Sequence, residues 1–245
     1  VSVEAFPVRL WKVGRRGGEP AFKSDFDIAR WRYRGPFAQL GSAIVVVIRT
    51  REGITGYGEV CPLGPFYLPA YAAGARTGIQ ELGPHLLGQD PTRLGPLNNL
   101  MDRALKGHSY VKSAIDMACW DILGKKTDLP VYTLLGGKQQ DKVKLYKVVT
   151  RTDPDAMAAR IPEYRAQGYR NFQVKVGENP LTDISRIRKI AACMEPGEVL
   201  NADANTGWSQ HSAMRVVKAV KNLDVTIEQP CESYDECLAV RRNTD

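Results

Sequence analysis

The chain has 245 residues and a mass of 27.2 kDa, and its 43% hydrophobic and 25% charged residues exclude a disordered, collagen-like or disulfide-stapled protein. Lys and Arg outnumber Asp and Glu by 34 to 27, but the basic residues are scattered in isolated pairs without a nucleic-acid-binding motif, so we expect no nucleic-acid partner. No apolar run is long enough to span a membrane and the first residues lack a signal-peptide pattern, so we expect no membrane association and a cytoplasmic location.

The first 137 residues predict an α+β domain. Residues 3–11, 43–50 and 54–60 have the pattern of strands, and the turn at 51–53 makes the last two an antiparallel hairpin. The polar connection over residues 14–36 is long, as lids often are. From residue 70 the apolar spacing becomes helical, with further helices over 94–105 and 111–123, until Gly136 and Gly137 end the block.

Residues 138–245 predict four βα units in succession. Strands are expected over 143–149, 171–176, 198–202 and 224–228, with helices over 154–167, 181–194, 209–222 and 234–243. This alternation predicts parallel strands with right-handed crossovers, either doubly wound or in a barrel. No glycine-rich phosphate-binding motif follows these strands, so we do not expect dinucleotide or P-loop chemistry.

Polar residues stand at the C-terminal ends of the last three predicted strands: Gln173 and Lys175, Asp203 and Asn205, and Glu228 and Gln229. Sites of parallel α/β folds are built at this end of the sheet, and residues i and i+2 of a strand face the same way. Two carboxylates on neighbouring strands suit Mg²⁺, and a lysine beside a divalent cation can act as a base near neutral pH. The set predicts removal of a proton next to a metal-bound carboxylate, with the metal stabilising the enediolate.

Each of these residues alone has a plainer interpretation. An Asp or Lys at a strand end often caps the next helix or lies in solvent, and residues 203–206 would serve as a capping segment. The functional prediction therefore depends on finding all three, Lys175, Asp203 and Glu228, at the same place on consecutive units.

Five motifs resemble one family, the mandelate racemase and muconate lactonizing enzymes of the enolase superfamily: AIDMACWDILGK (114–125), PVYTLLGG (130–137), FQVKVG (172–177), NADANTGW (201–208) and IEQP (227–230). The resemblance implies an α+β capping domain, residues 1–137, followed by a TIM-type, modified (β/α)7β barrel of which residues 138–245 hold about the first four units. It implies Lys175 as the acid/base and Asp203 and Glu228 as Mg²⁺ ligands, and we expect Asn205 to support them. Many relatives carry Lys-x-Lys where this chain has Gln173-x-Lys175, which favours a neutral amide contact to the substrate over a sugar-acid or muconate substrate.

A narrower resemblance concerns the branch of the family that acts on proline derivatives. It rests on residues 58–76 (GEVCPLGPFYLPAYAAGAR), 105–116 (LKGHSYVKSAID) and 228–242 (EQPCESYDECLAVRR). It implies a small carboxylate substrate, a proline derivative, contacted by Tyr67 and Gln173, although Tyr67 alone could equally be a packing aromatic in a Pro-rich turn. We expect a lyase that dehydrates cis-3-hydroxy-L-proline, with a racemase or 2-epimerase of a proline or hydroxyproline betaine as the alternative, and we expect a homo-oligomer.

The length of the chain limits this prediction. A (β/α) barrel needs about eight βα units, whereas the residues after Gly137 predict four. The resemblance places the third metal ligand on the fifth barrel strand and a second lysine on the sixth. We therefore expect a truncated chain, inactive alone, whose fourth strand lacks its next neighbour and whose metal site lacks one ligand. The alternative of another class is a non-catalytic homologue kept for oligomer assembly.

Overall fold

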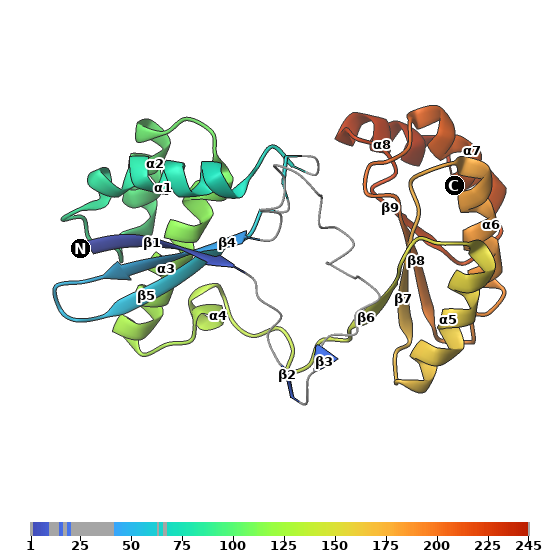
Figure 1. The fold of residues 1–245 in the computed structure, drawn as a ribbon, viewed down its shortest axis with the longest axis horizontal. Coiled ribbons are helices and arrows are strands. Elements are labelled where there is room, and N and C mark those ends of the chain that lie inside the picture. Colours follow the sequence, from blue (N-terminus) through green and yellow to red (C-terminus); the bar gives the residue numbers. More distant parts are fainter. Residues whose placement is uncertain are drawn as a thin grey trace. The chain divides into compact units, whose positions relative to one another are not determined.

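The computed structural model describes residues 42–62, 64, 65 and 68–244, together with the backbone of Ser2–Arg9, Arg15–Arg16 and Glu19–Pro20. The chain divides into two compact units, residues 1–141 and 142–245, coloured blue to green and yellow to red in Figure 1. Residues 137–145, at this division, form no helix or strand. The boundary expected after Gly137 lies at the start of the same stretch.

The first unit is a three-stranded antiparallel sheet with helices packed against it. The strand order is β1 (Ser2–Arg9), β4 (Ser42–Arg49), β5 (Thr55–Val60). Strands β4 and β5 form the expected hairpin. The helices of this unit are α1 (Ala72–Leu86), α2 (Leu94–Ala104), α3 (Ser109–Thr127) and α4 (Val131–Leu134). The segment expected to be one long loop contains a short antiparallel pair, β2 (Arg15–Arg16) and β3 (Glu19–Pro20).

Alternation along β4 directs apolar side chains into the core of the first unit. Ile44, Val46 and Ile48 are each at most 2% exposed and pack in one cluster with residues of α1, α2 and α3. Helix α3 lies so close to β5 that a Cβ atom at Gly58 would overlap the carbonyl oxygen of Ala114. Glycine is therefore required where this helix crosses the strand.

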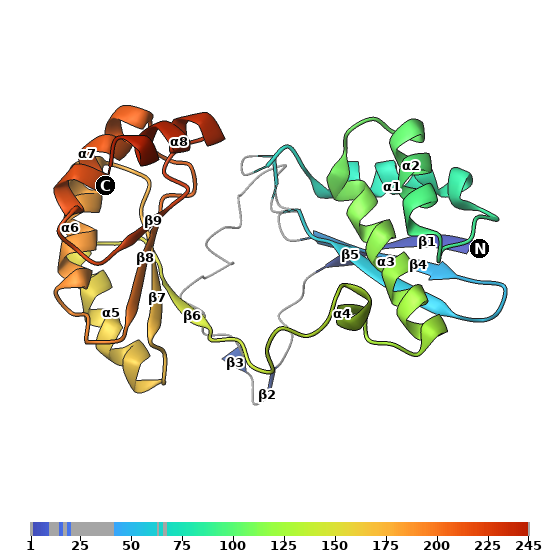
Figure 2. The same ribbon diagram turned by 180° about the vertical axis from the view of Figure 1, so that it is seen from behind.

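The second unit is a four-stranded parallel sheet whose spatial order follows the chain: β6 (Tyr146–Val149), β7 (Asn171–Lys175), β8 (Val199–Asp203) and β9 (Thr226–Glu228). The helices that follow these strands are α5 (Pro154–Ala166), α6 (Pro180–Ala191), α7 (Gln210–Val220) and α8 (Tyr234–Arg242). The predicted succession of four parallel βα units is confirmed (Figure 2). Strands β6 and β9 are the two edges of this sheet as far as the structure describes the chain.

Every helix of the second unit begins at a side chain that caps it. Asp153, Asn179, Ser209 and Ser233 each accept hydrogen bonds from backbone N–H groups of the first helical turn. Pro154 and Pro180 stand directly after two of these caps, where their missing N–H costs nothing. The helix starts are therefore encoded locally, and they set the length of each loop between strand and helix.

The two faces of the parallel sheet have different side chains. Phe172 and Val174 of β7 and Leu200 and Ala202 of β8 belong to one buried cluster with residues of α5, α6 and α7. The intervening residues of the same strands face the other way, since successive side chains of a strand alternate. The polar residues predicted to form the site lie on this second face.

Two strands of the parallel sheet begin two or more residues later than their sequences predict. The strand expected over 143–149 begins at Tyr146, which pairs with Asn171, the first residue of β7. Residues 143–145 precede that first pair and form no part of the strand. The last strand spans Thr226–Glu228 rather than 224–228, because its pairing with β8 begins at Thr226.

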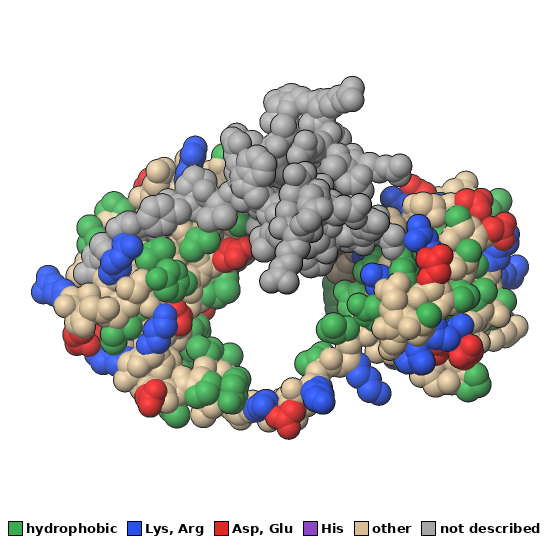
Figure 3. Space-filling view, turned by 60° about the horizontal axis from the view of Figure 1, so that its bottom comes forward, with side chains coloured by type: hydrophobic (Ala, Val, Ile, Leu, Met, Phe, Trp, Pro, Cys, Tyr) green, Lys and Arg blue, Asp and Glu red, His purple; other side chains and the backbone are tan. Residues whose placement is uncertain are grey.

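Charged side chains of both signs are interspersed on the face drawn in Figure 3. Each unit has local ion pairs, such as Lys125 with Asp121 in the first unit and Lys189 with Asp155 in the second. Within the part of the chain that the structure describes, no helix is long and apolar enough to cross a membrane.

A partly buried ion pair joins α5 to the residue just before β8. Arg165 donates two hydrogen bonds to Glu198, from Nε to Oε1 at 2.7 Å and from Nη2 to Oε2 at 2.8 Å. The Glu198 side chain is 1% exposed. The hydrogen bonds from Arg165 lower the pKa of Glu198 below its ordinary value of 4.5, against the opposing effect of burial. This pair ties the sheet to its helices at the end opposite the predicted site.

The ion pair predicts a pH-dependent stability. Because the pKa of Glu198 is lower in the folded protein than in the unfolded chain, its contribution is present above pH 4.5 and is lost as the pH falls through the folded value. Arg165→Gln should therefore lower the free energy of unfolding most near neutral pH, and the difference from wild type should narrow as the pH falls below 4.5. Urea unfolding followed by circular dichroism measures this. Lys189→Gln, which breaks a largely exposed pair, is the control, and a difference for Arg165→Gln that stays constant with pH would contradict the prediction.

Candidate active site

The register of the parallel sheet aligns the predicted site residues in two rows. Lys175 is paired with Asp203, and Asp203 with Glu228, so that one residue from each of β7, β8 and β9 forms a row at the C-terminal end. The row beneath it contains Gln173 paired with Asn201. Neighbouring strands lie about 4.8 Å apart, so side chains within a row are in reach of one another.

The side-chain nitrogen of Lys175 is bound by two residues at the end of β8 and just after it. Its ammonium Nζ donates to Oδ2 of Asp203 at 2.5 Å and to Oδ1 of Asn205 at 2.9 Å. The Lys175 side chain is 23% exposed, whereas that of Asp203 is 2% exposed. The lysine nitrogen thus lies at the boundary between the buried carboxylate and the space above the sheet, where a base can reach a substrate.

Glu228 is held from the row beneath it. The side-chain amides of Gln173 and Asn201 both donate to Oε2 of Glu228, at 2.8 Å and 2.5 Å. Gln173 is 5% exposed, so its amide is largely enclosed and engaged with Glu228. Two donors on one oxygen fix the direction of this carboxylate.

Asn201 is a site residue that the sequence prediction missed. It lies two residues before Asp203 on β8 and therefore faces the same way, a signal that the alternation rule would have provided. Its Oδ1 atom is buried and has no hydrogen-bond partner among the described residues. A buried acceptor of this kind is costly unless a donor reaches it, so a ligand or further protein group is expected there.

Asn205 reaches the site from a turn and not from the strand predicted for it. Strand β8 ends at Asp203, and Asn205 and Thr206 adopt left-handed backbone angles, with φ of 45° and 65°. The turn is closed by the Asn205 N–H, which donates to Oδ1 of Asp203 at 2.9 Å. The capping interpretation of residues 203–206 is wrong, because α7 begins later and is capped by Ser209.

The predicted substrate contact Tyr67 lies outside the described residues. Gln229 has a left-handed φ of 42° and its carbonyl accepts from the Thr206 N–H at 2.8 Å. The structure therefore brings together Gln173, Lys175, Asn201, Asp203, Asn205 and Glu228.

The donor set fits a hard divalent cation in part. Asp203 and Glu228 bring two carboxylates to neighbouring positions, against the single positive charge of Lys175, so these three side chains carry a net charge of −1 when ionised. Mg²⁺ is commonly held by one or two protein carboxylates, with waters and substrate completing its shell. No group of three His, Cys, Asp or Glu suited to a metal occurs in the described residues. The pair therefore supplies part of such a site.

The loops that follow β7 and β8 are packed against each other without spare room. Gly177, two residues after Lys175, has a φ of +100°, and a Cβ there would overlap the carbonyl oxygen of Ala204. The Val176 N–H donates to the carbonyl of Asp203 at 3.0 Å. The distance between the ends of the two strands, and with it the Lys175–Asp203 contact, depends on this close backbone packing.

Two family models match the sequence. Residues 36–136 match the model described as mandelate racemase / muconate lactonizing enzyme, N-terminal domain. Residues 156–245 match the model described as enolase C-terminal domain-like. Both agree with the family that the motifs resemble, and the second covers all of the site residues given above.

Individual relatives extend the comparison. The chain is 50% identical over 226 residues to cis-3-hydroxy-L-proline dehydratase from Roseibium aggregatum, with 91% of this chain and 62% of that protein covered. It is 31% identical to N-succinyl-L-Arg/Lys racemase from Bacillus cereus, with 86% and 58% covered. A crystal structure of an enolase-superfamily member from Roseovarius nubinhibens ISM, complexed with magnesium, matches with a TM-score of 0.79 and 45% identity, covering 83% of this chain and 56% of that one. The chain thus spans less than two thirds of the length of these relatives.

The packing at Gly177 predicts a large effect of a single added methyl group. Gly177→Ala should destabilise the second unit by about 1–2 kcal/mol through its positive φ and by about 1–3 kcal/mol more through overlap with Ala204. Gly168→Ala is a matched control, because its φ of +95° is similar and a Cβ there would meet nothing within 4 Å. Chemical denaturation of both variants measures the difference. Equal losses of stability would show that the loops yield easily and would contradict the prediction.

Proposed function

The chain belongs to the mandelate racemase and muconate lactonizing enzyme family of the enolase superfamily, and we propose that the whole protein is a Mg²⁺-dependent dehydratase of cis-3-hydroxy-L-proline. The observation that carries the proposal is the row Lys175, Asp203, Glu228, which joins a partly exposed amine to two carboxylates on consecutive strands. The 50% identity to a relative that bears this activity in its name supports the choice of substrate.

In this proposal Lys175 removes the α-proton of the substrate. The amine takes the proton onto Nζ, the electrons of the Cα–H bond form a double bond to C3, and the 3-hydroxyl leaves with a second proton as water. Lys175 must be neutral to accept the proton, and the neighbouring Asp203 and Asn205 then hold its nitrogen in place through their oxygens. Mg²⁺, held by Asp203 and Glu228, would supply positive charge that stabilises the negative charge developing on the substrate carboxylate.

The stereochemistry of the substrate limits what Lys175 can do alone. In cis-3-hydroxy-L-proline the α-hydrogen and the hydroxyl lie on opposite faces of the ring, so anti elimination needs one acid/base group on each face. Lys175 can serve only one face. The group for the other face is expected from a further strand, as the family resemblance implies.

Gln173 and Asn201 have a supporting role in this proposal. Their amides both bind Oε2 of Glu228, which fixes this carboxylate next to Asp203 in the same row. A direct contact of Gln173 or Tyr67 with the substrate stays a prediction, as do a homo-oligomeric state and a cytoplasmic location.

Epimerisation of a proline derivative is the second candidate, because it needs the same proton abstraction by Lys175. The 31% identity to a racemase from Bacillus cereus supports epimerisation as the alternative. A proline betaine without a 3-hydroxyl separates the two reactions, since epimerisation survives the loss of this hydroxyl and dehydration does not. A non-catalytic homologue would perform neither.

Replacing the proposed base tests the proposal directly. Lys175→Met in the full-length protein keeps the side-chain length and removes the amine, so we expect kcat for water loss from cis-3-hydroxy-L-proline to fall by about 10²–10⁴-fold. Proton NMR in D₂O follows both the loss of the hydroxyl and the exchange of the α-hydrogen. The change leaves the buried Asp203 without its ammonium partner and could unfold the protein. Circular dichroism is therefore needed to establish that the variant is folded.

Lys218→Met, on the exposed surface of α7, is the matched control and should turn over as wild type does. Normal turnover by folded Lys175→Met would refute the role given to this lysine. Exchange of the α-hydrogen of a proline betaine, without water loss from the hydroxyproline, would replace the dehydratase by the epimerase.

Metal affinity provides a test that does not need turnover. Titration calorimetry of Mg²⁺ into the full-length protein should show a loss of about 100-fold for Glu228→Gln, which removes a ligand charge, and of about 10-fold for Asn201→Ala, which removes a support. Glu232→Gln, an exposed carboxylate just beyond β9, is the control. If Glu228→Gln and Asn201→Ala both bind Mg²⁺ as wild type does, the ligand assignment is wrong.

A further inference from the structure

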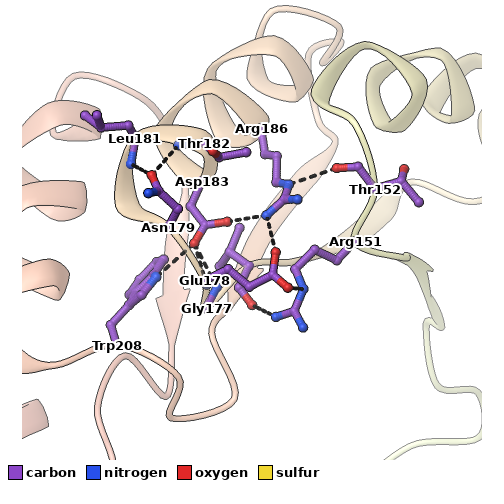
Figure 4. Close-up of polar contacts among 11 residues, drawn as sticks. Arg151, Thr152, Gly177, Glu178, Asn179, Leu181, Thr182, Asp183, Arg186 and Trp208 are labelled. Carbon is purple, nitrogen blue, oxygen red and sulfur yellow. Dashed lines mark hydrogen bonds and ion pairs between the residues drawn. The ribbon is translucent and has the colours of Figure 1, made fainter. Parts of the chain in front are cut away.

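A buried carboxylate outside the site binds the loop behind it. Asp183, in the first turn of α6, is 0% exposed, and its Oδ2 accepts from the backbone N–H groups of Gly177 at 3.1 Å and Glu178 at 2.8 Å (Figure 4). The same oxygen accepts from the indole Nε1 of Trp208 at 2.9 Å. Its other oxygen, Oδ1, accepts from Nη1 of Arg186 at 2.7 Å.

These bonds connect three loops of the sheet's C-terminal end. Gly177 and Glu178 belong to the loop after β7, and Trp208 to the loop after β8. Arg186, itself 7% exposed, extends the connection to the loop after β6, since its Nε donates to the carbonyl of Thr152 at 3.0 Å. One carboxylate and one guanidinium therefore link the loops that follow three successive strands.

Asp183 is connected to the proposed base Lys175 through the backbone, because it binds Gly177, which lies two residues after Lys175. Val176 stands between Lys175 and Gly177, and both of its backbone polar groups are bonded, its N–H to Asp203 at 3.0 Å and its carbonyl to Nη1 of Arg151 at 2.8 Å. Arg151 also forms an ion pair with Glu178, Nε to Oε1 at 3.1 Å. Lys175 thus ends a strand whose next three residues are each bonded to a neighbouring loop or helix.

We propose that Asp183 is a positioning residue for catalysis: through its bonds to the loops after β7 and β8 it sets where the Lys175 nitrogen lies relative to Asp203. This inference rests on the proposed role of Lys175 as a base. Asp183 touches neither Lys175 nor Asp203 in any described contact, so it acts through Gly177 and Trp208.

Stability alone is a weak reason for this arrangement. A buried ion pair loses hydration of both partners, and well-packed apolar residues in its place are often as stable or more so. What apolar residues could not do is bind two consecutive N–H groups, an indole N–H and a guanidinium in fixed directions. A displacement of about 1 Å in a reacting group can cost about 100-fold in rate, so fixed directions matter near the base.

The test is Asp183→Asn in the full-length protein, which keeps the shape of the side chain and removes its charge. We expect kcat to fall by about 10- to 100-fold while KM stays within about threefold, because the loss concerns placement of the base and not substrate binding. Hydrogen exchange measured by mass spectrometry on the metal-free protein should become faster in residues 175–180 and 204–209 only. Asp155→Asn is the control, since its carboxylate is 76% exposed and pairs with Lys189 on the outer surface.

A folded Asp183→Asn variant with wild-type kcat would overturn the inference, and so would an unchanged kcat accompanied by a lower melting temperature, which is what a purely structural role predicts. If Asp183→Asn does not fold, Trp208→Phe decides, because it removes one N–H and retains an aromatic ring. A decrease in kcat of about threefold or more with unchanged KM supports the inference, and no decrease overturns it. If the wild type turns over no proline derivative, the proposed function is wrong whatever Asp183 does. The hydrogen-exchange measurement then decides whether Asp183 orders the loops after β7 and β8.

Discussion

The site depends on the parallel register that places Lys175 beside Asp203 and Asp203 beside Glu228. Parallel pairing brings the C-terminal ends of all strands to one edge, so three residues far apart in sequence form one row. A shift by one residue in any strand would turn its polar side chains into the apolar core beneath the helices. The large cluster around Phe172 and Val174 is therefore what fixes the relative positions of the charged residues on the opposite face.

The register alone does not fix the position of the backbone at the C-terminal end of each strand. The close approach of the loops at Gly177, the turn through Asn205 and the buried carboxylate of Asp183 each constrain the backbone just beyond the site. The contacts of Asp183 and of the Asn205 turn use backbone N–H groups as donors, so they hold the backbone near Lys175, while Asp203 and Asn205 bind the Lys175 nitrogen itself.

Much of the second unit was predictable because its signals are local. Each strand is a short apolar run, each helix begins at a capping side chain, and the polar residues at the strand ends stand out against Val and Leu. Asn201 was missed, although the same alternation that pairs Gln173 with Lys175 also pairs it with Asp203. Asp183 and Arg186 could not be predicted in this way, because they lie on an amphipathic helix where a charged residue predicts exposure, and only the three-dimensional packing encloses them. The left-handed turn at Asn205 likewise depends on a neighbouring strand.

The apolar and polar residues of the parallel sheet lie on opposite faces, so the residues of one face can change in sequence without changing the other. Residues that pack in the apolar core and residues that form the polar site alternate along the same strand, so they belong to separate sets of contacts. Exchanging Gln173 or Asn201 changes the polarity beneath Glu228 without opening a cavity among the helices. The polar face can therefore change in sequence while the apolar core stays the same, which agrees with the similarity of this chain to both a dehydratase and a racemase.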